Sequence, residues 1–396
     1  VSKMTGYRTL AINRGEKEKF ITVKIEAPVD EIISYLEKKT ITGNNPEASK
    51  ILSDTIADSY VRLIAPAIDR EIRNYLTESA EDGAIKVFAS NLQQLLMQPP
   101  IAGQTVLGWD PAFRTGCKLA VVDPTGKVLD TVVIFPTAPQ KKVAEAKKIL
   151  KALIKKYGIT LISVGNGTAS RESEMVIAEL ISELDTPVQY VITNEAGASV
   201  YSASKLATEE FPNFDVGQRS AASIARRVQD PLAELVKIDP KAIGVGQYQH
   251  DMNQKKLSEA LDAVVEDSVN KVGVDLNTAS APLMEHISGI NKTLAKNIVD
   301  YREANGRFNA RKELLKVAKL GPKAYEQCAG FMRINGGSNP LDATSVHPES
   351  YDIATKLLEN VGYTTDDISS GRLTDISKSI KSIKELAQKL GTGTIT

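Results

Sequence analysis

Two lysine-bearing turns, about thirty residues apart, have the residue types of an anion-binding site. The first reads Ile287-Ser288-Gly289-Ile290-Asn291-Lys292, and the second reads Ala318-Lys319-Leu320-Gly321-Pro322-Lys323. In each, an apolar residue, a turn glycine and a lysine open a new helical segment. Backbone N–H groups and an ammonium group would then point outward at one place. We therefore predict two helix-hairpin-helix motifs that contact phosphate groups.

The residues around the two turns repeat a common scheme. Apolar residues fit the packed faces of short helices at Leu283, Ile287, Ile290, Leu294, Ala295 and Ile298, and again at Leu314, Leu315, Val317 and Leu320. The candidate contact residues are Gly289, Asn291, Lys292, Lys296, Gly321 and Lys323. The alternative is two helical turns with glycine caps and solvated lysines. Agreement between the two copies favours the paired motif.

The charge of this segment indicates its partner. Residues 283–333 contain ten Lys/Arg and five Asp/Glu, whereas the whole chain carries 49 of each. A basic module on an uncharged scaffold favours nucleic acid over a membrane or an acidic small molecule. Because the contacts would be amides and lysines, we expect sequence-independent binding to the backbone of RNA or DNA. A platform whose hairpins bind protein is one alternative.

A second set of residues could hold a divalent metal ion. Asp110 and Glu195 each follow a strand-like run, as the acids of an RNase H-like nuclease must. The third acid should come from the last helix, where residues 218–222 read QRSAA and no acid follows until Asp230. Asp215, just before that helix, is a weak substitute.

With two acids and no clear third, we predict no catalytic residue, no metal site and no cofactor. The main alternative is a metal-dependent RNase H-like nuclease or resolvase that uses Asp110 and Glu195. The three histidines, His250, His286 and His347, are too scattered to be metal ligands, and we expect His347 to cap a helix or pack.

The segment Gly165-Asn166-Gly167-Thr168 could cradle a phosphate. It lacks the Lys-Ser/Thr of a nucleotide-binding loop. We therefore predict a strand-to-helix turn that Thr168 or Ser170 caps.

The first hundred residues predict a mainly helical region. Residues 7–25 predict a β-hairpin, with strands at 7–12 and 20–25. Helices should follow at 29–39 and through 46–97, with a break at Pro66.

The next segment has α/β character. It predicts strands at 105–109, 118–123, 128–135, 160–164 and 188–193, with helices at 141–157 and 172–184 and two more afterwards. Three strands followed by alternating helices and strands is the RNase H-like order, a mixed sheet with helices on its faces.

The expected fold class is a multidomain α protein with one α/β domain. The predicted segments are 1–103, a β-hairpin plus helical core; 104–232, the RNase H-like domain; 233–275, a helical connector; 276–335, the tandem hairpins; and 336–396, a further helical domain. The two cysteines, far apart in sequence, predict reduced thiols in a cytoplasmic protein. No apolar stretch approaches the roughly twenty residues of a membrane span. The chain begins at Val1 without an initiator Met, so we expect a fragment.

Several stretches together resemble a known family, the bacterial Tex proteins, transcription accessory factors related to a eukaryotic elongation factor. They are residues 10–16 (LAINRGE), 109–111 (WDP), 114–118 (RTGCK), 165–172 (GNGTASRE), 194–201 (NEAGASVY), 229–235 (QDPLAEL), 244–251 (GVGQYQHD) and 347–349 (HPE). The resemblance implies a helical core, an RNase H-like domain of YqgF type, tandem helix-hairpin-helix motifs and a further helical hairpin domain.

The resemblance also implies that the RNase H-like domain is catalytically degenerate. Related active domains carry an Asp where this chain has Ser220. The family normally adds N-terminal helices and a C-terminal OB-fold RNA-binding domain, which we expect to be missing here. RNA polymerase or other transcription machinery is a candidate partner.

Overall fold

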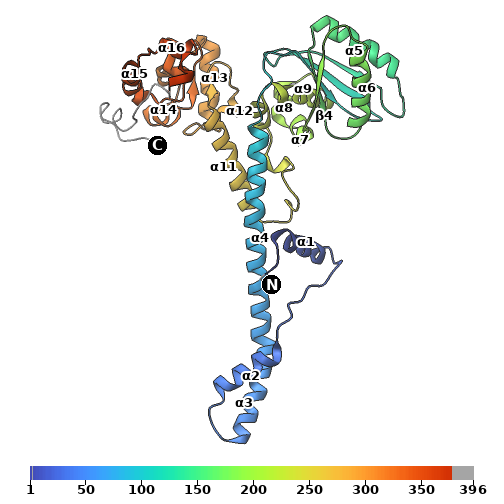
Figure 1. The fold of residues 1–396 in the computed structure, drawn as a ribbon, viewed down its shortest axis with the longest axis vertical. Helices are drawn as coiled ribbons and strands as arrows, with labels where there is room; N and C mark the ends of the chain where they lie inside the picture. The colour runs from blue at the N-terminus through green and yellow to red at the C-terminus, as the bar shows by residue number, and fades with distance from the viewer. Residues whose placement is uncertain (2, 377–396) are drawn as a thin grey trace. The chain divides into compact units, whose positions relative to one another are not determined.

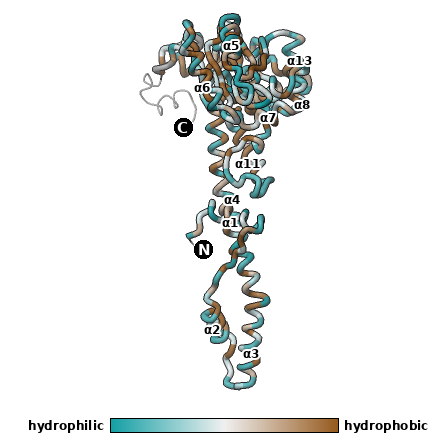
Figure 2. Tube along the Cα trace, turned by 90° about the vertical axis from the view of Figure 1, so that its right-hand side faces the viewer, coloured by the Kyte–Doolittle hydropathy of each residue, from teal (hydrophilic) through white to brown (hydrophobic). Residues whose placement is uncertain are grey.

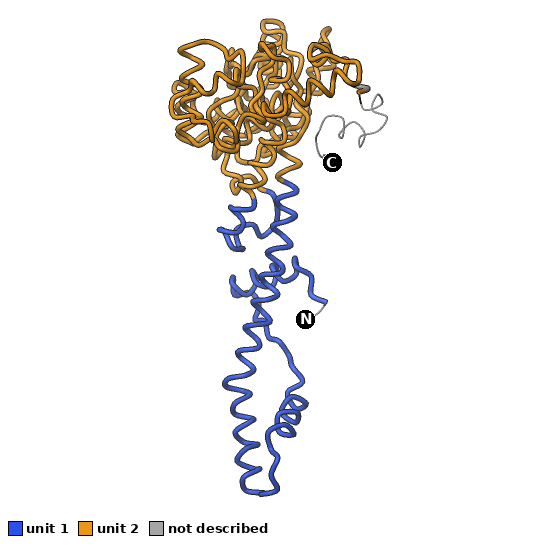
Figure 3. The backbone as a smooth tube through the Cα atoms, turned by 90° about the vertical axis from the view of Figure 1, so that its left-hand side faces the viewer, with its two compact units in different colours: residues 1–91, 245–260 blue, residues 92–244, 261–396 orange. Residues whose placement is uncertain are grey.

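The computed structural model describes residue 1 and residues 3–376. The chain divides into two compact units (Figure 3). One comprises residues 1–91 and 245–260, and the other comprises residues 92–244 and 261–396.

The first unit is helical. Its elements are α1 (Gly6–Lys17), α2 (Val29–Thr40), α3 (Pro46–Ser59), a π-helix (Tyr60–Ile64) and α4 (Ala65–Leu96), whose last residues belong to the second unit. The β-hairpin predicted for residues 7–25 is wrong, because residues 7–17 lie in α1 and residues 20–25 form no strand. Contacts with α4 explain the helix. The Asn13 amide donates to Thr77 Oγ1 at 2.9 Å, and Glu16 pairs with Arg73.

The break predicted at Pro66 takes the form of a widened turn. Proline has no N–H, and its ring would clash with the carbonyl of Arg62 in a regular helix. The π-helix before it relieves this crowding, and the Ala65 amide donates to the Tyr60 carbonyl. The helix then continues to Leu96, with apolar residues recurring among hydrophilic ones along α4 (Figure 2).

The second unit contains the RNase H-like sheet. Its strands are β1 (Val106–Asp110), β2 (Cys117–Val122), β3 (Val128–Ile134), β4 (Leu161–Gly165) and β5 (Gln189–Thr193), in the order β3-β2-β1-β4-β5. The first three strands pair antiparallel, whereas β1, β4 and β5 pair parallel. The predicted mixed sheet and strand order are confirmed.

Helices cover both faces of this sheet (Figure 1). α5 (Val143–Tyr157) and α6 (Ser170–Ser182) pack on Leu107 and its neighbours, and α9 (Val216–Gln229) packs on the Val106 side. α9 comes unusually close to β1, because a Cβ at Gly108 would lie 2.0 Å from the carbonyl oxygen of Ala221. This close packing sets Ser220 beside the end of β1.

Short elements lead from the sheet to the hairpins. They are α7 (Ala198–Ser202), α8 (Lys205–Glu210), α10 (Pro231–Leu235), a 3₁₀ turn (Pro240–Ala242) and α11 (Gln254–Val272). The hairpin region comprises β6 (Val274–Asp275), α12 (Ala281–Met284), α13 (Lys292–Asn305), a 3₁₀ segment (Arg311–Lys316), α14 (Pro322–Cys328) and β7 (Met332–Arg333). Because β6 pairs with β7, the beginning and end of this region are joined.

The chain then continues through further short helices. They are 3₁₀ turns at Pro340–Ala343 and Pro348–Ser350, α15 (Tyr351–Asn360), α16 (Asp366–Ser369) and a 3₁₀ turn at Arg372–Asp375. The prediction that His347 caps or packs is confirmed, since its ring accepts from the Glu349 amide. Within the described residues, no helix combines the length and apolar character needed to cross a bilayer.

One buried side chain joins the hairpin region to these later helices. Arg311 is 1% exposed, and its guanidinium donates to the carbonyl oxygens of Met332, Thr344 and Val346 and to the Tyr351 hydroxyl. Its backbone amide donates to the buried Asp342 carboxylate at 3.0 Å, and Tyr351 donates to the same carboxylate.

We predict that Arg311→Ala destabilises this region by about 3–5 kcal/mol, because it leaves the carbonyl oxygens of Met332, Thr344 and Val346 and the Tyr351 hydroxyl without their guanidinium donor. Hydrogen exchange of the Ile334 and Thr344 amides would report the loss locally. Lys312→Ala, at the exposed residue next to Arg311, is the control and should change exchange little. Unchanged protection in Arg311→Ala would contradict the prediction.

Candidate nucleic-acid interface

The first hairpin turns at a glycine and enters a long helix. Gly289 has a φ of 80°, in the left-handed region that favours glycine. Ile290 is buried, and Asn291 caps α13 by accepting the Leu294 amide at 3.0 Å. The first amides of a helix have no hydrogen-bond acceptor inside that helix. The Asn291 cap supplies an acceptor only for the third of them, the Leu294 amide. The amides of Lys292 and Thr293 therefore belong to an exposed helix start that attracts anions.

The second hairpin has the same path but different chemistry. Lys319 takes the left-handed conformation, with a φ of 67°, and Gly321 occupies the cap position with extended backbone at φ −84° and ψ 173°. Lys319 thus corresponds to Gly289, and Gly321 corresponds to Asn291. Lys292 and Lys323 therefore differ by one position in their helices, since Lys292 is the first residue of α13 and Lys323 is the second of α14. Because Pro322 opens α14 and has no N–H, this turn offers fewer amides.

The two hairpins pack on each other reciprocally. A Cβ at Gly289 would lie 2.7 Å from the Gln327 Cβ and 3.3 Å from the Ala324 carbonyl oxygen, both on α14. In return, the Asn297 side chain on α13 donates to the Ala318 carbonyl at 2.7 Å. Each second helix therefore contacts the turn of the other hairpin, which holds the two turns as a pair.

Polar side chains outside the motif fix the first hairpin. The Asn270 side chain on α11 accepts the Ser288 amide at 3.1 Å and donates to the His286 carbonyl at 3.3 Å. Arg302 of α13 donates to the carbonyls of Leu276 and Ala279 at 2.8 and 3.0 Å. Arg302 is therefore a structural cation, although it contributes to the basic excess of the segment.

The lysines of the pair face solvent. Lys292, Lys296, Lys319 and Lys323 are exposed, and within the described part of the chain none of them makes an ion pair. Lys319 was not among the candidates predicted from sequence. Its position in the repeat could have indicated it, because Lys319 occupies the position in the second hairpin that Gly289 occupies in the first.

The two acids of the RNase H-like domain lie near each other. Burial raises the pKa of Asp110, and a hydrogen bond from Ser220 and the Lys118 ammonium partly offset this. Burial and the nearby Asp110 raise the pKa of Glu195. Ser220 therefore occupies the position beside Asp110 where the sequence lacked a third acid.

The predicted turn at Gly165-Asn166-Gly167-Thr168 binds a carboxylate of the protein itself. The Gly167 amide donates to the Glu195 carboxylate, and the Asn166 side chain accepts the Glu195 amide at 3.1 Å. A Cβ at Gly165 or Gly167 would lie 2.1 or 1.7 Å from a Glu195 oxygen. A cap by Thr168 or Ser170 is wrong, because Ala169 precedes α6 and no side chain caps the helix. The loop is filled and cannot cradle a phosphate in this arrangement.

A buried cation completes this arrangement. Arg227 is 4% exposed, and it donates to the carbonyls of Asn194 and Ala196, both at 2.8 Å. It thereby holds the backbone on either side of Glu195. Asp215 is the N-cap of α9 in a capping box with Gln218, so it is no metal ligand here.

The metal that an RNase H-like fold implies does not fit these residues. Among the described residues, no group of three or more His, Cys, Asp or Glu side chains is placed to hold a metal ion. One Glu195 oxygen is buried and has no hydrogen-bond partner, but its neighbours at the site are Asp110 and the Ser220 hydroxyl.

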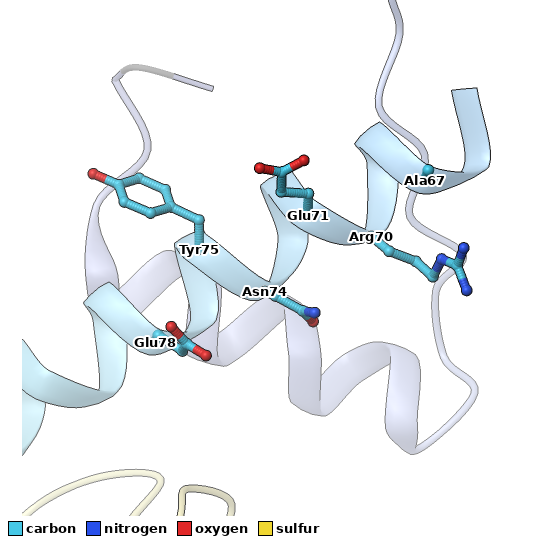
Figure 4. Close-up of a pocket in the computed structure, with 6 residues that line it drawn as sticks. All are labelled: Ala67, Arg70, Glu71, Asn74, Tyr75 and Glu78. Carbon is cyan, nitrogen blue, oxygen red and sulfur yellow. The ribbon is translucent and has the colours of Figure 1, made fainter. Parts of the chain in front are cut away.

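A hollow on α4 offers no comparable site. It has a volume of about 610 Å³ and is lined by Ala67, Arg70, Glu71, Asn74, Tyr75 and Glu78. Figure 4 shows that all six come from one helix. A surface from a single helix lacks the converging groups of a binding site.

Family models match most of the chain. A Tex protein YqgF-like domain matches residues 104–229, and a Tex central region-like model matches residues 1–88. A helix-hairpin-helix motif matches residues 269–333, and an HHH domain matches residues 339–396.

Three relatives illustrate the similarity of the whole chain. The Transcriptional accessory protein Tex of Neisseria gonorrhoeae is 48% identical over 100% of this chain and 52% of its own length. Protein YhgF of Escherichia coli is 45% identical over 100% of this chain and 52% of its own length. The human S1 RNA-binding domain-containing protein 1 is 40% identical over 98% of this chain and 45% of its own length.

The chain spans about half the length of these relatives. Similarity extends from the helical first unit through the sheet and both hairpins, and two of the matched models are specific to one family. The chain therefore belongs to the Tex family.

Proposed function

We propose that this chain is the nucleic-acid-binding core of a cytoplasmic transcription accessory factor and acts as a non-catalytic scaffold. It binds RNA or DNA through the phosphate backbone, independent of sequence. The observation that carries this proposal is the hairpin pair, which carries four exposed lysines, two of them in the first turns of α13. Two relatives, a transcriptional accessory protein and an S1 RNA-binding domain-containing protein, support transcription as the process and RNA as a ligand. RNA polymerase is a candidate partner.

The two hairpins contribute unequally. The first combines helix amides with Lys292 and Lys296, one turn apart on α13. The second depends on its side chains, Lys319 and Lys323, because Pro322 removes an amide and α14 has only seven residues. Amides and ammonium groups contact phosphate oxygens and do not read base edges, so binding carries no sequence preference.

The RNase H-like domain supports the scaffold through its fold. Ser220 is uncharged and cannot replace a carboxylate as a metal ligand. Glu195 is engaged by the Gly167 amide, and its backbone is fixed by Arg227. A metal-dependent nuclease remains the second candidate, because Asp110 and Glu195 still face each other.

A salt titration tests the binding proposal. The slope of log K against log salt should be about −0.7 to −0.9 per phosphate contact. Changing Lys292 and Lys323 together to Glu should weaken binding by more than about 1 kcal/mol, because each reversal removes a phosphate partner and adds repulsion. The matched control is Lys155→Glu with Lys205→Glu, at exposed lysines outside the hairpins. Salt-independent binding, or equal losses in the two double variants, would refute the interface.

The turn geometry predicts a difference between two glycines. Gly289→Val should destabilise the hairpin pair by about 1–3 kcal/mol, since it forces a β-branched residue into the left-handed region and against α14. Gly321→Val should be tolerated, because its backbone is extended and no atom lies within 4 Å of an added Cβ. Thermal unfolding and binding of both variants provide the comparison. Equal damage would show that the turn geometry is not the cause.

Catalytic silence is the third expectation. The protein should not cleave labelled branched DNA or RNA with Mg²⁺ or Mn²⁺, and Asp110→Asn should leave nucleic-acid binding intact. Ser220→Asp, which adds the missing carboxylate, should bind Mn²⁺ more tightly than the unmodified chain in calorimetry. Metal-dependent cleavage that disappears in Asp110→Asn would instead establish the nuclease.

A further inference from the structure

The strand β5 forms one edge of the sheet, and its outer side has free backbone groups. The Gln189 amide donates to the Thr160 carbonyl and the Asn166 amide donates to the Thr193 carbonyl, both at 3.0 Å. In a parallel ladder, alternate residues bond to the neighbouring strand, so residues 189, 191 and 193 face β4. The N–H and C=O groups of Tyr190 and Ile192 therefore point outward.

Apolar side chains accompany these free groups. Tyr190 is 38% exposed, Ile192 40% and Met175, on the neighbouring α6, 62%. The Tyr190 hydroxyl donates to Glu174 of α6 at 3.0 Å, which places its ring along that helix. The edge thus offers both hydrogen-bonding groups and apolar contact area.

The opposite edge of the sheet is protected differently. The strand β3 carries a register shift opposite Val121 and Val122, and it places a charged residue, Asp130, on the edge. Bulges and charges are devices that keep an edge strand from pairing with other chains. β5 has neither within its five residues. An unprotected apolar edge is therefore expected to have a partner.

The charge of the residues around β5 indicates which chemistry a partner of this edge would have. Residues 170–195 contain one Lys/Arg, Arg171, and six Asp/Glu: Glu172, Glu174, Glu179, Glu183, Asp185 and Glu195. Glu179 and Glu183 pair with lysines of α5. Glu174 lies beside Tyr190, and Asp185 lies in the turn that enters β5. Such a border repels phosphate and attracts basic side chains.

We propose that the β5 edge is a docking site for an extended protein segment that alternates apolar and basic residues. The segment adds a strand to the five-stranded sheet beside β5. Its backbone pairs with Tyr190 and Ile192, its apolar side chains cover Met175 and Ile192, and its basic side chains meet Glu174 and Asp185. This site is independent of the hairpins and of the proposed nucleic-acid binding.

The test uses a fluorescent nine-residue peptide of alternating Val and Lys, titrated with the full chain and followed by anisotropy. Ile192→Pro removes one outward N–H and leaves the ladder with β4 intact. We expect it to weaken peptide binding at least about tenfold. The matched control is Leu129→Pro on β3, where Leu129 is equally exposed at 40% and lies at the register shift. This control should bind the peptide normally, as should the chain with Lys292 and Lys323 changed to Glu.

Other outcomes would overturn the proposal. The proposal fails if the full chain does not bind the peptide at millimolar concentration. It also fails if a Val–Glu peptide binds as tightly as the Val–Lys peptide, or if Ile192→Pro binds the Val–Lys peptide as tightly as the unmodified chain. If Ile192→Pro fails to fold by circular dichroism, Ile192→Lys keeps the backbone and should repel the basic peptide. Sedimentation that shows a dimer lost in Ile192→Pro would assign the edge to a second copy of this chain instead.

Discussion

The hairpin pair depends on the burial of one guanidinium group. Arg311 is 1% exposed, so its N–H groups must find acceptors inside the protein, and they do so on four residues that follow the second hairpin. Burying an arginine without hydrogen-bond acceptors would cost more free energy than the folding of a short loop contributes. The segment from Met332 to Tyr351 is therefore folded back over the hairpins. Their turns have buried apolar residues of their own, such as Ile290 and Leu320, while their lysines remain in solvent.

Sequence patterns predicted the elements whose partners lie nearby in the chain. The sheet order followed from strands and helices with clear periodicity, and Asp110 and Glu195 were located because each ends or closely follows a predicted strand. Ser220 lies inside α9 and was identified as the position where related active domains carry an acid. The first helix was missed because residues 7–12 owe their conformation to contacts of Asn13 and Glu16 with α4, some sixty residues away. The offset between the hairpins was missed because the left-handed position of the second copy is a lysine, so the two turn glycines do not stand at equivalent positions.

The region around Glu195 supports the proposal of a non-catalytic scaffold. The loop at residues 165–167 has the small residues and free amides of a phosphate cradle, yet a carboxylate of the protein occupies it. Arg227 then binds the backbone on both sides of that carboxylate from within the core. Metal chemistry of the RNase H type would require a third carboxylate beside Asp110, and it would also require Glu195 to leave a site that two glycines shape around it.

The distribution of charge gives this neutral chain two kinds of surface. The hairpin segment has twice as many basic as acidic residues, whereas residues 170–195, which include β5, have six acidic residues and one basic. Glu174 and Asp185 are the acidic residues beside β5 that the proposed segment would meet. At 0.1 M salt, electrostatic interactions between exposed charges are screened beyond about 10 Å, so each surface acts mainly on the ligand next to it. A phosphate backbone drawn to α13 is repelled from β5, and a basic segment drawn to β5 is repelled from α13. Under the two proposals, opposite local charges on a chain of no net charge direct a nucleic acid and a basic protein segment to different surfaces, so the two ligands do not compete.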